Sequence, residues 1–323
     1  MEARKCGESV LRRKALKALK IFKTSGLKGV AETVADRLSY YIAVKMIQKK
    51  ARMAAPPIPF KDVKELAGVD FSIAVHIHLY YEDLAGEFCG YLQNIPFDFD
   101  LYVSCREGVD AGGIEKKFCS LCRAKKIAVK NVENRGRDLL PFYVIFGKEL
   151  AGYKYVMHAH TKKSLHYGRE QVLWRENSMN ALCGSQELVQ KIFYMFETKS
   201  AGLVYPENYE TLRYDAYSWV GCKAAGRALL KRLRVPCPSG FFLYPAGSFF
   251  WARTQAIKPI FDLNLTRDDF PVEQGQKDGT IAHALERAVA IVSRRLGFHD
   301  VIVDIRGKAF RKDFSPLAFE RLG

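Results

Sequence analysis

Apolar runs and amphipathic segments alternate along the chain from about residue 70 onwards. Residues 71–80 form a short run that is hydrophobic enough to be a strand buried on both faces. Further apolar runs follow, separated by segments whose apolar positions have helical spacing. Strands that alternate with helices in this way predict an α/β fold with a mostly parallel sheet and right-handed crossovers.

The same pattern gives bounds for each expected element. We expect strands at residues 71–80, 99–104, 126–132, 153–157, 201–205, 247–252 and 301–305. We expect helices at residues 82–92, 113–124, 139–150, 186–198, 215–233, 254–261 and 280–292. The alternation is regular up to about residue 165 and looser beyond it, so we divide this body into a half at about 70–165 and a half at about 166–323.

The first 55 residues differ in charge from the rest. Residues 8–53 show helical spacing with Lys and Arg between the apolar positions, and residues 1–53 carry fourteen basic against four acidic side chains. Ten of the sixteen net positive charges therefore lie in this segment. A proline-rich stretch at 54–59 predicts a linker, so we expect a basic helical extension at 1–55 and a domain at 56–323. Such a helix either lies on an anionic membrane surface or packs on the domain.

Composition narrows the class of protein. An apolar fraction of 48% allows a globular core, and a net charge of +16 fits nucleic acid, an anionic membrane or a phosphorylated substrate as partner. The eight cysteines are scattered, and the C-x-x-C pair of Cys119 and Cys122 has no second pair to complete a zinc site. These features favour a cytoplasmic protein, and no apolar run is long enough to predict a membrane span or a secretory signal.

The first candidate site is the turn Asn134-Arg135-Gly136-Arg137-Asp138, which follows a predicted strand. Arginine forks hold phosphate or carboxylate oxygens through two N–H groups, and glycine lets the backbone approach a ligand closely. The turn fits neither the P-loop pattern nor the G-x-G-x-x-G pattern of dinucleotide sites. It predicts either contact with the phosphates of a nucleotide or a solvated loop with an Arg–Asp pair.

His158 and His160 end the fourth predicted strand, and Lys162 and Lys163 follow them. Side chains two residues apart on a strand point to the same face, so the two histidines fit a metal site. No acidic third ligand is near in sequence, and the lysines favour an anion instead, because cationic side chains can stabilise a diphosphate leaving group. Metal ligation, diphosphate contact and a structural role all stay open at this point.

His76 and His78 have the same spacing on the first predicted strand. In an open α/β sheet the ligand crevice lies at the carboxyl ends of the strands. We therefore expect at least one of the two to face a ligand, the alternative being that both are core residues.

Two carboxylates, Glu273 and Asp278, precede the predicted helix at 280–292. An acid in this position either caps the helix or, kept ionised there, acts as the base for a hydroxyl nucleophile. His283 and Glu286 lie in the same helix, either supporting the site or facing solvent.

Six of these segments together resemble the rhamnan synthesis protein F family of bacterial polysaccharide glycosyltransferases. The matching segments are AVHIHLYY at 74–81, FDLYVS at 99–104, ENRGRD at 133–138, HAHTKKS at 158–164, GSFFWAR at 247–253 and DGTIAHALER at 278–287. They occur in the expected order over about residues 70–290, and the basic extension lies outside them.

This resemblance implies transfer of rhamnose from dTDP-L-rhamnose to a hydroxyl of a growing cell-surface polysaccharide such as O-antigen. The acceptor would be a lipid-linked glycan, and the enzyme would be cytoplasmic and peripherally bound to the anionic inner membrane. The first half of the domain would bind the nucleotide sugar and the second half the acceptor. The implied donor and diphosphate contacts are His76, His78, Asn134, Arg135, Arg137, Asp138, His158, His160, Lys162 and Lys163.

The resemblance also implies a GT-A-like, Rossmann-type sheet flanked by helices. The metal-binding D-x-D of such folds would fall where this chain has His158-Ala159-His160, so a divalent metal is open but not favoured, and no metal ligands are assigned. Asp278, or failing it Glu273, would deprotonate the acceptor if the reaction inverts configuration. Tyr244, Trp251 and His283 are the expected acceptor or sugar contacts.

Two other classes of function compete with this one. A nucleic-acid-binding protein would use the excess positive charge, but the charge gathers at one end and the body has no known recognition motif. A non-catalytic relative would bind a glycan or assemble a polysaccharide complex.

Overall fold

A computed structural model describes residues 71–161, 169–207, 217–238, 242–276, 278–303 and 310–312, together with Leu27, Ala31, Val34, Ala35 and Leu38. The chain divides into two compact units. One comprises residues 1–54 and 238–241, and the other comprises residues 55–237 and 242–323. The five residues between 27 and 38 are helical, and the rest of the predicted basic extension lies outside the described residues.

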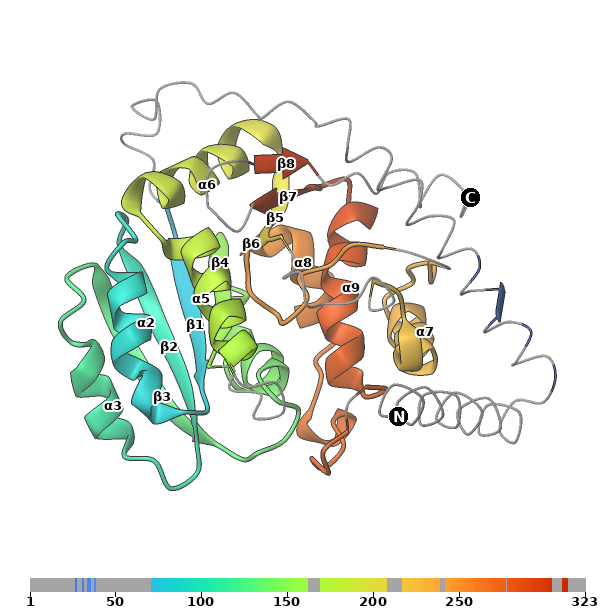
Figure 1. Cartoon of the computed structure of the whole chain (residues 1–323), viewed down its shortest axis with the longest axis horizontal. Coiled ribbons are helices and arrows are strands. Elements are labelled where there is room, and N and C mark those ends of the chain that lie inside the picture. The colour runs from blue at the N-terminus through green and yellow to red at the C-terminus, as the bar shows by residue number, and fades with distance from the viewer. Residues whose placement is uncertain are drawn as a thin grey trace, which may run out of the picture. The chain divides into compact units, whose positions relative to one another are not determined.

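Within the described part of the larger unit, eight strands form a single sheet in the order β3-β2-β1-β4-β6-β5-β7-β8 (Figure 1). They are β1 (Ile73–Leu79), β2 (Phe99–Arg106), β3 (Ala124–Val132), β4 (Tyr155–His160), β5 (Ala201–Pro206), β6 (Phe250–Arg253), β7 (His299–Val303) and β8 (Phe310–Lys312). Strands β1 to β4 run parallel, as do β5 and β7, while β6 is antiparallel to both of its neighbours and β8 to β7. The predicted α/β fold with a mostly parallel sheet is confirmed.

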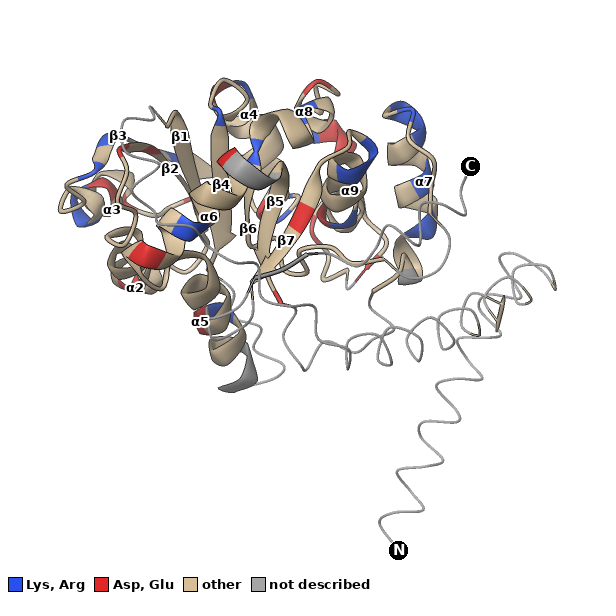
Figure 2. Ribbon diagram, turned by 90° about the horizontal axis from the view of Figure 1, so that it is seen from above, with Lys and Arg blue, Asp and Glu red and all other residues tan. Residues whose placement is uncertain are grey.

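Helices cover both faces of the sheet (Figure 1). On one face lie α2 (Ala85–Leu92), α3 (Ala111–Phe118), α5 (Arg169–Cys183) and α6 (Gln186–Lys199). On the other lie α4 (Gly147–Leu150), α8 (Thr254–Phe261), α9 (Ile281–Arg295) and, beside α9, α7 (Lys223–Arg232), whose Lys and Arg positions are blue on the ribbon of Figure 2. Each face has its own hydrophobic core, so the sheet is buried between two layers.

Alternation along β1 decides which face receives the histidines. Ile73, Val75 and Ile77 are fully buried in the core against α2, α3, α5 and α6, whereas Ala74 belongs to the core on the α9 face. Because successive side chains of a strand point to opposite faces, His76 and His78 share the face of Ala74. The histidines of β1 therefore lie on the side of the sheet that α9 covers.

Some expected elements differ from the observed ones. The helix expected at 139–150 is a π-helical turn at Pro141–Ile145 followed by the short α4, and the helix expected at 215–233 starts only at Lys223. Helix α5 was not expected, because a buried Arg175 that donates to Glu87 through two 2.8 Å bonds interrupts its apolar spacing. No helix within the described ranges has both the length and the hydrophobicity needed to cross a membrane.

Candidate functional site

A pocket of about 260 Å³ opens at the carboxyl ends of β1 and β4. Parallel strands bring these ends to one edge of the sheet, where α/β proteins bind ligands. The turn after β3, the loop before β6 and the first turns of α9 complete the wall. The lining residues are His78, Tyr80, Asn134, Arg137, Asp138, Leu139, His160, Thr161, Gly247, Ser248, Ala282, His283 and Glu286. Five of the six sequence segments described above, at 74–81, 133–138, 158–164, 247–253 and 278–287, thus contribute residues to one cavity.

The turn after β3 requires glycine at position 136. Gly136 has φ +63°, and a Cβ there would lie 2.5 Å from the ring of Phe270 and 2.6 Å from Leu140. Arg137 follows at φ +57°, in the left-handed region that costs a side chain roughly 1–2 kcal/mol. The turn thereby places the Arg137 side chain, 41% exposed, in the wall of the pocket.

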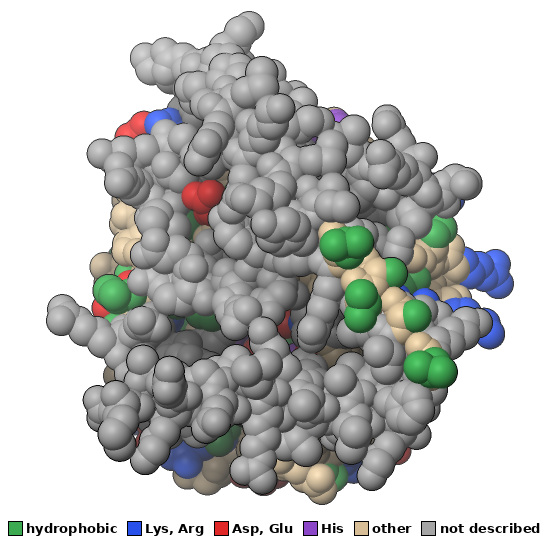
Figure 3. Space-filling view, turned by 45° about the vertical axis from the view of Figure 1, so that its right-hand side comes forward, with side chains coloured by type: hydrophobic (Ala, Val, Ile, Leu, Met, Phe, Trp, Pro, Cys, Tyr) green, Lys and Arg blue, Asp and Glu red, His purple; other side chains and the backbone are tan. Residues whose placement is uncertain are grey.

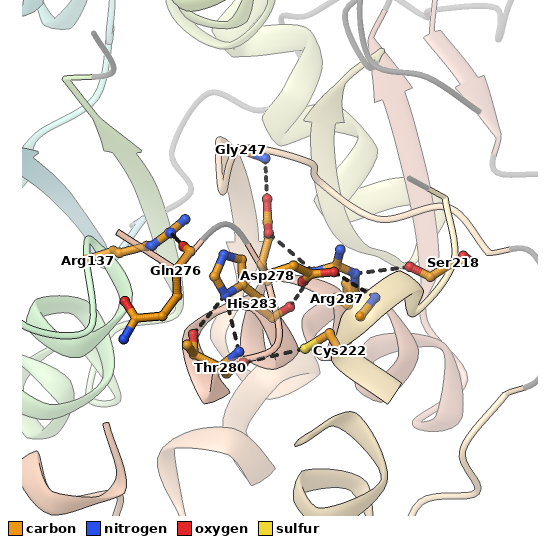
Figure 4. Close-up of polar contacts among 11 residues, drawn as sticks. Arg137, Ser218, Cys222, Gly247, Gln276, Asp278, Thr280, His283 and Arg287 are labelled. Carbon is orange, nitrogen blue, oxygen red and sulfur yellow. Dashed lines mark hydrogen bonds and ion pairs between the residues drawn. The ribbon is translucent and has the colours of Figure 1, made fainter. Parts of the chain in front are cut away.

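Polar contacts hold Arg137 beside the loop that precedes α9 (Figure 4). Its Nη2 donates to the carbonyl of Gln276, and its Nε lies 3.9 Å from a carboxylate oxygen of Glu273. Arg135 points elsewhere, since its Nε donates to the carbonyl of Phe270 at 2.7 Å and it does not line the pocket. The two arginines of this turn therefore differ in role: Arg137 faces the cavity and Arg135 fastens the loop.

Three histidines, a serine and an aspartate form a continuous buried chain of hydrogen bonds. Nε2 of His158 lies 3.0 Å from Oδ2 of Asp138, and Nδ1 of His158 lies 2.9 Å from Nδ1 of His76. Nε2 of His76 lies 3.2 Å from Oγ of Ser104, which lies 2.9 Å from Nδ1 of His78. The sheet register produces this arrangement, because His76 pairs with His158 and His78 with Ser104 on neighbouring strands.

Burial sets the charges of this chain. Burial lowers the pKa of His76 well below its ordinary value, with His158 adding to the effect, and it lowers the pKa of His78 to about 3. Burial alone would raise the pKa of Asp138, but His160 and the hydrogen bond from His158 outweigh it and hold that pKa below its ordinary value. At neutral pH, His76 and His78 are therefore neutral and Asp138 is ionised.

The Gly247 peptide closes the opposite wall of the pocket. Nε2 of His160 donates to the Gly247 carbonyl at 2.6 Å, and the Gly247 N–H donates to Glu286 at 2.6 Å. Gly247 and Ser248 both have positive φ, at +89° and +58°. One backbone unit thus joins the end of β4 to α9, and it orients both His160 and Glu286.

The first turn of α9 presents His283 to the cavity. Thr280 is the N-cap, and Nδ1 of His283 lies 2.8 Å from its hydroxyl and 3.4 Å from its N–H (Figure 4). Since Nδ1 accepts from this N–H, the neutral ring carries its proton on Nε2, which is buried and has no hydrogen-bond partner among the described residues. Burial lowers the pKa of His283, and the nearby charge of Arg137 lowers it further. His283 is thus a neutral donor in the pocket wall.

The sequence profile of the rhamnan synthesis protein F family matches residues 29–296, which is most of the chain. This chain belongs to that family. The family predicted from the sequence motifs is therefore confirmed, and the matched range includes every residue that lines the pocket.

Individual relatives of this family member are known from Xanthomonas campestris pv. campestris. The chain is 34% identical to one "Uncharacterized protein WxcX" and 33% identical to its counterpart in strain B100, in each case over 242 residues. The match takes in 72% of the chain but only 33% of each relative, so the chain spans about a third of their length. A solved structure titled "Crystal Structure of a Mycobacterial Protein" is similar at 16% identity, over 79% of this chain and 88% of that one, with a TM-score of 0.34.

The two carboxylates expected to act as base do not line the pocket of this family member. Asp278 accepts from the Gly221 N–H at 2.9 Å and lies 3.4 Å from Nη1 of Arg287, with 23% of its side chain exposed (Figure 4). Glu273 pairs with Arg137, as described above. Glu286, which the sequence placed in the same helix as His283 with either a supporting role or a solvent-facing position, does line the pocket.

Two predicted sugar contacts lie in the core instead. Trp251 is fully buried and its indole N–H donates to the Leu182 carbonyl at 3.2 Å, so a sugar cannot reach its ring. Tyr244 is 2% exposed, and its ring lies under the Arg287 guanidinium at 5.3 Å. Both expectations are corrected: these aromatic residues pack the two cores. Lys162 and Lys163 lie outside the described residues.

The paired histidines on β4 do not converge on a point. His158 faces Asp138 and His76, whereas His160 faces the Gly247 carbonyl, and their ring centroids are 6.4 Å apart. In the part of the chain that the structure describes, no group of three or more His, Cys, Asp or Glu side chains is placed to hold a metal ion.

Proposed function

We propose that this chain is a glycosyltransferase module that moves a sugar from a nucleoside-diphosphate donor to a hydroxyl of a growing cell-surface polysaccharide. The name of its family, rhamnan synthesis, supports rhamnose as the sugar and dTDP-L-rhamnose as the donor. The observation that carries the proposal is the pocket at the carboxyl edge of the sheet, where an arginine, two carboxylates and neutral histidines face one cavity.

The chemistry of the pocket wall divides into a cationic side and a neutral side. Arg137 and Asn134 lie on the turn after β3, and a guanidinium is suited to diphosphate oxygens. Lys162 and Lys163 directly follow the end of β4, and we assign them to the same diphosphate. His78 and His283 are neutral groups suited to the hydroxyls of a sugar. We therefore place the sugar between β1 and α9.

The size of the cavity fits this division. Binding pockets that enclose a whole drug-sized ligand measure about 300–1,000 Å³. At about 260 Å³ the pocket holds a sugar and the phosphate next to it, and the nucleoside extends beyond it. We propose further that the sheet is of GT-A type and that His158-Ala159-His160 stands where a metal-binding D-x-D would be.

The carboxylates that precede α9 take supporting roles in this proposal. Asp278 holds Arg287, and Glu273 balances the charge of Arg137. Neither needs to touch the substrate for this, since each acts by fixing a cation in place.

We also propose an anionic membrane surface as partner, with a lipid-linked glycan as acceptor. Leu27, Val34 and Leu38 lie on helix and are 77%, 59% and 62% exposed, and hydrophobic side chains stand in a row on the face shown in Figure 3. Their spacing puts them on one side of a helix, in a segment with ten net positive charges. The match covers 33% of each relative, and we propose that the rest of their length contains further domains for polysaccharide synthesis.

The test uses the full chain and a panel of nucleotide sugars that includes dTDP-L-rhamnose, with and without EDTA, and follows release of nucleoside diphosphate. We expect release from one donor and binding of dTDP by calorimetry. Arg137→Ala should weaken dTDP binding at least tenfold, a loss of about 1.4 kcal/mol. Arg123→Ala is the matched control, because Arg123 is 59% exposed and precedes β3 at the opposite edge of the sheet. Salt-sensitive retention of DNA or RNA without turnover of any donor would contradict the proposal.

A further inference from the structure

The buried chain Asp138–His158–His76–Ser104–His78 begins and ends at the pocket. Asp138 and His78 line the cavity, whereas His76, Ser104 and His158 are 0% exposed. Phe142 stacks on the ring of His158 with centroids 4.6 Å apart, and Phe146 lies 5.6 Å from that of His76. Because these apolar rings pack against His158 and His76, the polar atoms of His76, Ser104 and His158 form hydrogen bonds within the chain.

The direction of each hydrogen bond follows from one fixed end. Ionised Asp138 only accepts, so Nε2 of His158 carries a proton and, in the neutral ring, Nδ1 accepts. Nδ1 of His76 must then donate, and its Nε2 accepts from Ser104. The serine has a single proton to give, so its oxygen accepts from Nδ1 of His78. Nε2 of His78 is left as a lone pair, in a residue that lines the pocket.

One added proton reverses three of the four hydrogen bonds of this chain, and the bond from His158 to Asp138 keeps its direction. If Nε2 of His78 takes up a proton, its Nδ1 proton can pass to Ser104, the serine proton to His76, and the Nδ1 proton of His76 to His158. The charge then sits on His158, 3.0 Å from the Asp138 carboxylate. Burial disfavours an imidazolium at His78 itself, and the transfers move the positive charge from His78 to the ring that contacts the Asp138 carboxylate.

We propose that His78 is the catalytic base of this protein and that Ser104 and His76 relay the proton from the acceptor hydroxyl to the His158–Asp138 pair. This inference rests on the proposed glycosyl transfer. The acceptor O–H bond breaks as its oxygen bonds to the anomeric carbon of the donor. The bond from that carbon to the diphosphate oxygen breaks, and its electron pair leaves with the nucleoside diphosphate. The proton goes to Nε2 of His78, and one proton moves along each of the three links between His78 and His158.

His78 touches the substrate in this scheme, and the other members act through it. Other titratable groups beside the relay include His160 on β4, Tyr143 on the π-helical turn and Tyr80, whose ring centroid lies 6.2 Å from that of His78. His160 donates to the Gly247 carbonyl, and burial raises the pKa of Tyr143, so that Tyr143 stays protonated. None of these three side chains belongs to the five-membered chain of hydrogen bonds.

The first test reads the proton positions directly. In the full chain with ¹⁵N-labelled histidine, NMR at neutral pH should show His76 and His78 with the proton on Nδ1 and His158 with it on Nε2. In Ser104→Ala the link is cut, and the ¹⁵N shifts of His78 should change while those of His158 stay. A proton on Nε2 of His78 in the unmodified protein would overturn the relay.

The second test reads turnover of the donor identified by the nucleotide-sugar panel. Ser104→Ala should lower kcat about 100-fold or more, the size of a general base contribution, while KM changes less than about threefold. Ser104→Thr restores the hydroxyl and should recover most of kcat. Ser178→Ala is the matched control, because Ser178 is also buried and bonds only the Trp174 carbonyl within α5.

The two hypotheses fail in different ways. Unchanged kcat in Ser104→Ala overturns the relay and leaves the glycosyl transfer standing. If NMR shows the expected proton positions but no nucleotide sugar is consumed, the glycosyl transfer is overturned, and His78 is not the base of that reaction. The order of hydrogen bonds would still hold.

Discussion

The Nδ1 atoms of His76 and His158 lie 2.9 Å apart on neighbouring parallel strands. Both rings are fully buried, so a single proton must sit between the two nitrogens when both rings are neutral. Asp138 decides which ring holds it, because the carboxylate takes the other proton of His158. Through this chain of hydrogen bonds, the position of the proton on His78 in the pocket depends on the buried carboxylate of Asp138, which belongs to the turn after β3.

Removing that residue should destabilise the fold. Asp138→Ala leaves Nε2 of His158 buried without a partner, which costs about 1–3 kcal/mol in the free energy of unfolding. Urea denaturation followed by fluorescence measures it. Asp98→Ala is the control, since Asp98 is 48% exposed and solvent screens its two ion pairs. Equal losses in the two variants would argue against a buried Asp138–His158 contact.

The turn at Gly136 should tolerate no side chain. Gly136→Ala adds a Cβ that overlaps Phe270 and Leu140, costing about 1–3 kcal/mol, on top of about 1–2 kcal/mol for the left-handed backbone. Gly108→Ala also has positive φ but meets open space, so only the backbone cost applies. The same unfolding experiment compares them. We also expect weaker dTDP binding in Gly136→Ala alone, because the turn positions Arg137.

Stability should fall in acid because of the buried histidines. The pKa of His78 is about 3 in the folded chain against an ordinary 6.5, so below pH 6.5 the unfolded chain binds a proton that the folded chain does not. The contribution of His78 to the free energy of unfolding is therefore complete above pH 6.5. It falls by about 1.4 kcal/mol for each pH unit below 6.5 and levels off below about pH 3. Urea midpoints at pH 7, 6 and 5 test this, and His78→Asn should flatten the slope. His299→Gln, at the exposed start of β7, is the control; an equal slope in His78→Asn and the unmodified protein would contradict it.

Asp278 should matter less than a base would. Asp278→Asn keeps the shape of the side chain and loosens Arg287, so we expect turnover to fall less than about tenfold. Loss of a general base costs about 10²–10⁴-fold instead. Nucleoside diphosphate release under saturating donor distinguishes the two. A loss beyond a hundredfold with dTDP binding intact would return the base role to Asp278.

The exposed helical residues of the smaller unit should bind membranes. Val34→Asp with Leu38→Asp places charges among exposed apolar side chains and should abolish sedimentation with phosphatidylglycerol vesicles. Phosphatidylcholine vesicles should bind less even without the substitutions, since the segment is basic. Leu296→Asp, 47% exposed after α9, is the control. Equal sedimentation of the double variant and the unmodified protein would exclude this surface as the membrane contact.

Local patterns were sufficient for the α/β class, for most strands and for five of the segments that meet at the pocket. They failed where a charged residue occupies a buried position that the pattern reserves for an apolar side chain, as Arg175 does in α5. They also failed for Trp251, whose size and strand position are equally compatible with a sugar platform and with a core. Exposure is a property of the packed chain, so no local pattern separates the two.

The sequence by itself determined the alternation of strands and helices, the family, and the presence of histidines and basic residues at strand ends. Only the tertiary structure decided that Ser104 bridges His76 and His78, and that Glu286 rather than Asp278 lines the pocket. These outcomes depend on the register between strands far apart in the chain, and on the angle at which α9 meets the sheet. Hydrophobic periodicity fixes which face a side chain takes, whereas its partner across the sheet is set by long-range packing.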